Sequence, residues 1–195
     1  MHRWGRYVAA YVGLAALAVG IGWGWLGYAM WTLPDPWLAL GAPHAVSAGA
    51  GAGLAAVVIG LTRLLVPRLA WARQLHRDLR PVARGLGPLG VVALAVFSAL
   101  GEELLFRGLA QPLVGVWLQA LIFGVIHQGP GKSRWVWVAW ATVMGLLLGL
   151  LFQLTGSLVG PVVAHALINA VNLTYLKHHD PDPKPSRLGG LLRQR

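Results

Sequence analysis

Three short motifs place polar side chains inside highly apolar stretches of this sequence. Their residues are Glu102, Glu103, Arg107, Phe123, His127, His165 and Asn169. An ionisable group in hydrocarbon costs about 2.5 to 3.5 kcal/mol on insertion scales, so such groups face the protein interior and need a reason to be there. Carboxylate, imidazole and amide groups in one place can move protons and stabilise a developing negative charge.

The first motif, GEELLFRG at 101–108, carries two glutamates and one arginine. Glu103 and Arg107 stand four residues apart with the glutamate on the N-terminal side, which is the favoured order for an ion pair along a helix. Glu102 projects about 100° away around the same helix and lacks that partner. We expect Glu103 and Arg107 to form a structural pair and Glu102 to be available for chemistry.

The other two motifs repeat the four-residue spacing. Phe123 lies one helical turn before His127 on the same face, and His165 lies one turn before Asn169. Counted at about 1.5 Å per residue from the predicted helix ends, the side chains of Glu102, His127 and His165 lie roughly 10 to 20 Å deep in the membrane. The sequence therefore predicts that they converge on one intramembrane cavity.

Most of these residues also have a purely structural interpretation. His127 lies near a predicted helix end, where an interfacial histidine is common. His165 and Asn169 can link helices through hydrogen bonds, as polar groups in bundles do, and Phe123 can be a core residue. Glu102 is the hardest to explain in this way, because an unpaired carboxyl group in lipid is either neutral or functional.

The composition indicates which elements position these residues. Of the 195 residues, 56% are hydrophobic, and the six acidic and sixteen basic residues are too few to cover a soluble domain. We predict an all-α, polytopic transmembrane helix bundle surrounded by the lipid bilayer. The net charge of +10 is attributed to loops at an anionic membrane surface, so no nucleic acid partner is expected. The absence of cysteine excludes disulfides, thiolate nucleophiles and cysteine-ligated metals.

A length of about 20 apolar residues per crossing predicts about six spans. These spans are 7–31, 37–66, 86–111, 113–127, 135–154 and 158–176. The arginine-rich connector 67–85 is predicted to be a polar loop, and the basic tail 177–195 is predicted to be disordered. Residues 1–176 then form one integral membrane domain, whose motif-bearing core is about 86–176.

The basic residues also predict the orientation of the bundle. With six crossings, the connector, the loop after the fourth span and the tail all lie on one side, and the positive-inside rule makes that side cytoplasmic. Both termini are therefore expected in the cytoplasm, with the bundle in a bacterial inner membrane. The first span is too long for a signal peptide, so it is expected to remain as an anchor.

The combination of motifs resembles the CAAX protease and bacteriocin-processing family of intramembrane endopeptidases. The pattern reads EExxxR from Glu102, FxxxH from Phe123 and HxxxN from His165, in this order on successive apolar segments. The resemblance covers about 91–176. It implies an all-α bundle with a conical cavity that cleaves membrane-tethered peptides or proteins, and the compact chain is similar to the myxosortase-like group of that family.

Position by position, the resemblance makes Glu102 the carboxylate that activates water, with His127 assisting. His165 and Asn169 would stabilise the oxyanion. The supporting residues would be Glu103, Arg107 and Phe123.

The sequence leaves the role of a metal and the presence of catalysis open. Members of the family have been described both as metal-dependent and as glutamate-dependent. A divalent metal such as zinc would take Glu102, His127 and His165 as ligands, whereas Asn169 suits an oxyanion donor better and favours a metal-free mechanism. The alternative function is that of a non-catalytic membrane immunity or peptide-binding protein with the same bundle.

Overall fold

A computed structural model describes residues 3–24, 27, 29–33, 35–129 and 131–182. Its elements are α1 (Arg3–Gly24), α2 (Pro43–Arg68), α3 (Ala70–Arg84), α4 (Pro88–Glu103), the π-helix η1 (Leu104–Ala110), α5 (Gln111–Ile126), α6 (Arg134–Thr155) and α7 (Val159–His178). Within the described residues the only β-type pairing is an isolated bridge between Thr32 and Ser157. The all-α prediction is thus confirmed.

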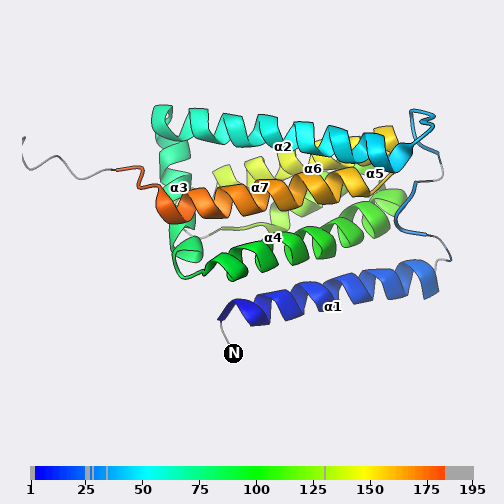
Figure 1. Cartoon of the computed structure of the whole chain (residues 1–195), viewed down its shortest axis with the longest axis horizontal. Coiled ribbons are helices and arrows are strands. Elements are labelled where there is room, and N and C mark those ends of the chain that lie inside the picture. The colour runs from blue at the N-terminus through cyan, green and yellow to red at the C-terminus, as the bar shows by residue number, and fades with distance from the viewer. Residues whose placement is uncertain (1–2, 25–26, 28, 34, 130, 183–195) are drawn as a thin grey trace, which may run out of the picture.

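The long helices pack as a bundle with one short helix across its end. Figure 1 shows α2, α7, α4 and α1 side by side, with α5 and α6 behind them. The first turn of α1, helix α3 and the last turn of α7 lie at the same end. The fold therefore gathers the basic connector and both ends of the described chain at one end of the bundle.

Five helical stretches are long and apolar enough to cross a membrane. Four of them are α1, α2, α6 and α7, and the fifth is the continuous stretch Pro88–Ile126 of 39 residues. That stretch contains both the third and the fourth predicted span, which explains why about six spans were expected. The protein is an integral membrane protein whose polar groups must be satisfied inside the bundle.

The fifth stretch folds back on itself at Gly115. This residue has φ 81° and ψ 165°, a backbone conformation that is open almost only to glycine. A straight helix would place residues 102 and 127 about 37 Å apart. The ring centroids of Phe106 and Phe123 instead lie 4.9 Å apart, so the second arm of the stretch runs back along the first.

The segment between α1 and α2 is not part of either span, which corrects the predicted bounds 7–31 and 37–66. Helix α1 ends at Gly24, and α2 begins only at Pro43, in the first turn, where proline is favoured. The intervening backbone instead bonds to the turn between α6 and α7: Leu33 N–H donates to the Gly156 carbonyl at 2.9 Å. Apolar side chains in this segment misled the length-based prediction.

The arginine-rich connector is also different from its prediction, because it forms helix α3 and not a loop. From α3, the Asp78 carboxylate accepts hydrogen bonds from the Ser133 hydroxyl at 2.6 Å and from the Ser133 N–H at 3.0 Å. These bonds, led by that of the hydroxyl, hold the pKa of Asp78 below its usual value. Helix α3 thereby fixes the start of α6.

Part of the predicted tail is ordered against α3. Helix α7 continues to His178, and Arg80 pairs with Asp180 at 2.8 Å. Residues 183–195 lie outside the described residues, so their predicted disorder stays a prediction.

Candidate active site

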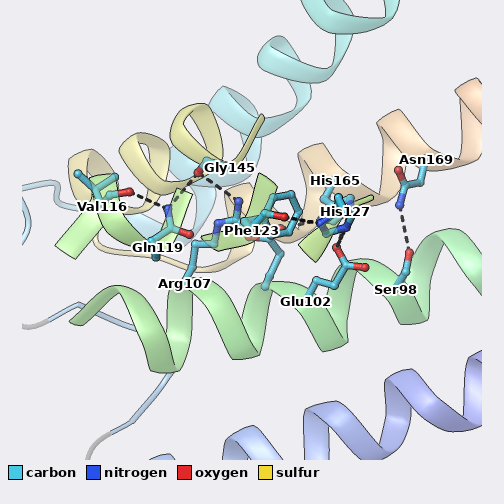
Figure 2. Close-up of polar contacts among 11 residues, drawn as sticks. Ser98, Glu102, Arg107, Val116, Gln119, Phe123, His127, Gly145, His165 and Asn169 are labelled. Carbon is cyan, nitrogen blue, oxygen red and sulfur yellow. Dashed lines mark hydrogen bonds and ion pairs between the residues drawn. The ribbon is translucent and has the colours of Figure 1, made fainter. Parts of the chain in front are cut away.

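Three helices bring the predicted motif residues together. Glu102 lies in the last turn of α4, His127 directly follows α5, and His165 lies in the middle of α7. The Nε2 atom of His127 is 3.4 Å from Glu102 Oε2, and that of His165 is 3.8 Å from the same oxygen. Figure 2 shows both imidazoles beside this carboxylate. The predicted convergence of the three side chains is therefore seen in the structure.

His127 is held by the end of its own helix. Its Nδ1 lies 2.6 Å from the Phe123 carbonyl oxygen, and since a carbonyl can only accept, Nδ1 carries the proton. That carbonyl is free to accept because the last turn of a helix has no intrahelical donors for its carbonyls. The Nε2 atom of His127 consequently faces Glu102 as a proton acceptor when the ring is neutral.

His165 is held by Glu103. Its Nδ1–H donates to Glu103 Oε1 at 2.7 Å, while Arg107 Nη1 donates to the same oxygen at 2.9 Å. The predicted pair of Glu103 and Arg107 thus exists, and both side chains are 0% exposed. The sequence did not indicate that Glu103 also orients His165, because the two residues lie 62 positions apart.

Arg107 continues this network away from the glutamates. Its Nη2 donates to the Gly145 carbonyl at 3.2 Å, and its guanidinium lies 4.6 Å over the ring of Phe123. The Phe123 ring in turn lies 4.2 Å from the ring of His127. Phe123 therefore contacts both the supporting cation and one of the two imidazoles.

Asn169 lies one turn beyond His165 and does not contact Glu102. Its Nδ2 donates to the Ser98 hydroxyl at 3.0 Å (Figure 2). An amide nitrogen has two hydrogens, so one N–H of Asn169 remains available to a further acceptor. The structure thus brings Asn169 beside the three-residue cluster but not into it.

Two buried polar residues near the site were missed in the sequence. Ser98 lies one turn before Glu102 and accepts from Asn169. Gln119 lies one turn before Phe123 and donates to the Gly145 carbonyl at 3.1 Å, as Arg107 does. In both cases the four-residue spacing to a motif residue was visible, and it places them on the same helix face.

Burial limits the access of water to the cluster. Glu102 is 7% exposed, whereas the His127 side chain is 22% exposed and is the most open of the three. Two surface pockets lie elsewhere, one at α3 and residues 180–182 and one between α2 and α7. The catalytic cavity expected around Glu102 therefore stays a prediction.

The donor set was also tested for a metal site. Among the described residues, no group of three histidine, cysteine or carboxylate side chains is arranged to hold a metal ion. Both Nε2 atoms point toward one oxygen of Glu102, and this geometry suits transfer of a proton. The residues present thus do not fit the His2Glu zinc site that the sequence left open.

Comparison with known proteins identifies the segment that carries the site. Residues 84–171 match a family model described as Type II CAAX prenyl endopeptidase Rce1-like. This segment belongs to the Rce1-like family. It contains all seven motif residues, and it confirms the predicted resemblance to CAAX-type membrane proteases, whereas the myxosortase-like subgroup stays untested.

One curated relative matches part of the chain. The Uncharacterized protein YpbD of Bacillus subtilis (strain 168) is 38% identical over 81 residues, which cover 42% of this chain and 42% of that protein. No solved structure matches the chain significantly. The similarity to known proteins is thus concentrated in the Rce1-like segment.

Proposed function

We propose that this protein is an intramembrane endopeptidase that hydrolyses a peptide bond in a membrane-anchored protein or peptide. The observation that carries the proposal is the convergence of both imidazole Nε2 atoms on Glu102 Oε2, at 3.4 and 3.8 Å. This cluster lies within the Rce1-like segment of a helical membrane bundle.

Glu102 is the general base in the proposed reaction. Its carboxylate takes a proton from a water molecule while the water oxygen attacks the carbonyl carbon of the substrate. The Nε2 atom of His127, 3.4 Å away, relays this proton to the nitrogen of the leaving amine, and the C–N bond breaks. The products are a carboxylic acid and an amine, so no further reactant is needed.

His165 and Asn169 stabilise the negative charge that develops on the substrate oxygen. Because Nδ1 of His165 donates to Glu103, the Glu103 carboxylate stabilises an imidazolium whose Nε2–H points toward the reaction centre, as the aspartate does in a catalytic triad. Asn169 contributes its second N–H. This arrangement needs a small shift of Asn169 from its Ser98 contact when substrate binds.

The proposal is tested by comparing the termini of membrane proteins in cells that express the wild-type chain or Glu102→Gln at equal levels. The wild type is expected to generate a defined set of new termini that are absent with the variant. Identical termini in both samples would refute the endopeptidase and leave the non-catalytic peptide-binding function as the explanation.

A second experiment separates the two mechanisms. Purified protein that is exhaustively chelated and shown by metal analysis to contain no metal is expected to retain at least about half of its activity, because the donor set does not fit a metal ion. Chelation under the same conditions should inactivate a known zinc peptidase that serves as the control. Loss of activity that returns with added zinc would contradict the metal-free mechanism.

The orientation follows from the distribution of charge. We propose that the end of the bundle with α3 faces the bacterial cytoplasm, because its arginines can contact anionic lipid headgroups there. Both termini then lie on the cytoplasmic side.

A further inference from the structure

Helix α1 packs against α4 through glycines of α4. A Cβ atom at Gly101 would lie 2.7 Å from the backbone oxygen of Tyr11, which is closer than real side chains approach. A Cβ atom at Gly90 would lie 3.1 Å from the indole of Trp4. The two backbones thus make direct contact beside Glu102, and the absence of side chains on α4 permits it.

This contact brings a phenol to the candidate active site. Tyr11 lies against Gly101, and its side chain hydrogen-bonds to the neighbouring residue, Glu102. Helix α4 lies between α1 and α7 (Figure 1). The Glu102 carboxylate is therefore reached by His165 from one helix and by Tyr11 from another.

The phenol has a clear reason to interact with Glu102. Tyr11 lies in an apolar helix that spans the membrane, where a hydroxyl group without a partner is costly. The carboxylate needs donors as well, because neutral imidazoles with protonated Nδ1 atoms offer it none. A bond from the phenol O–H satisfies both groups.

We propose that Tyr11 is a positioning residue for Glu102, holding the carboxylate so that Oε2 faces the two imidazoles. The inference rests on the proposed function, since it assigns Glu102 the role of the base. It also assigns a role to α1, which lies outside the Rce1-like segment 84–171. The motif-bearing segment alone would then lack one group that its base requires.

The test compares Tyr11→Phe with Tyr7→Phe in the full-length protein reconstituted in vesicles. Tyr7 lies one turn earlier on the same helix and is 63% exposed, so the control makes the same chemical change away from Glu102. The substrate is a membrane-tethered peptide that contains the bond identified by the comparison of termini. Tyr11→Phe is expected to lower kcat roughly 10-fold, with KM and the melting temperature unchanged, as loss of an orienting partner does. Tyr7→Phe is expected to behave as the wild type.

A second variant tests the packing that places the phenol. Gly101→Ala should displace α1 and lower kcat, and Tyr11→Phe added to Gly101→Ala should then cause little further loss. Fully independent effects of the two changes would contradict the inference.

Other outcomes separate this inference from the proposed function. If Tyr11→Phe has the kcat of Tyr7→Phe while Glu102→Gln is inactive, Tyr11 has no positioning role and the endopeptidase stands. A loss of kcat that occurs together with an equal loss of folded protein would likewise overturn the positioning role. If Glu102→Gln is fully active in the same assay, the proposed function itself fails.

Discussion

Replacing Glu102 with glutamine is expected to lower kcat by about 10³-fold, the magnitude typical of removing a general base. Glutamine has the same shape and can still accept a hydrogen bond through its amide oxygen, but it cannot take a proton from water. Because Glu102 is 7% exposed and has no arginine partner among the described residues, exchange for a neutral group should leave the melting temperature unchanged or raise it. The measurement combines single-turnover cleavage of the tethered peptide with thermal unfolding.

The adjacent glutamate supplies the matched control. Glu103→Gln removes the charge that Arg107 and His165 share at 2.9 and 2.7 Å, so this variant should lose folded protein as well as activity. The two neighbouring substitutions thus have different signatures, since only that at Glu102 separates activity from stability. A Glu102→Gln protein that keeps more than about a tenth of the wild-type kcat would contradict the role of a general base.

The four-residue spacings predicted the candidate site well because they depend only on helix geometry. The ion pair of Glu103 and Arg107 needs one helical turn, and it forms at 2.9 Å although η1 begins at Leu104. The same spacing correctly left Glu102 free of arginine. Contacts within a turn are set locally, and the sequence was sufficient for them.

The contacts between distant segments required the structure. The approach of His127 to Glu102 depends on the reversal at Gly115, and glycine is common enough in this chain, with 26 residues, that its conformation could not be predicted. The contact between Tyr11 and Glu102 depends on the backbone approach at Gly101. Neither glycine stands within a recognisable motif, so the sequence gave no indication of either contact.

Apolar composition also misjudged segments at the ends of the bundle. The segment between α1 and α2 is rich in tryptophan and leucine, yet its backbone bonds to the turn between α6 and α7 and does not extend a helix. The connector that became α3 was predicted as a loop because charge was taken as evidence against structure. Its arginines instead occupy one face of an amphipathic helix, which is suited to a membrane surface.

Replacing Arg107 with methionine is expected to have the largest effect on stability. Arg107 and Glu103 are both 0% exposed, and removal of one partner from a buried pair costs about 3 to 5 kcal/mol because a charge is left without compensation. Most of the Arg107→Met protein should therefore fail to accumulate in the membrane. The control is Arg77→Met, because Arg77 pairs with Asp182 at the surface, where the side chains are 43% and 53% exposed. A surface pair contributes about 0 to 1 kcal/mol, so this control should accumulate normally.

The double variant Glu103→Gln with Arg107→Met then separates the structural role of the pair from its role in catalysis. Neutralising both partners removes the stranded charge, so folding should recover to within about 1 to 2 kcal/mol of the wild type, as replacement of a buried pair by neutral groups often allows. His165 would still find an acceptor in the glutamine oxygen at position 103, but it would lose the negative charge that stabilises its imidazolium. Activity should therefore stay about 10- to 100-fold below the wild type in a protein that is folded. Recovery of both stability and full activity would show that Glu103 and Arg107 support only the bundle, and that His165 is oriented without them.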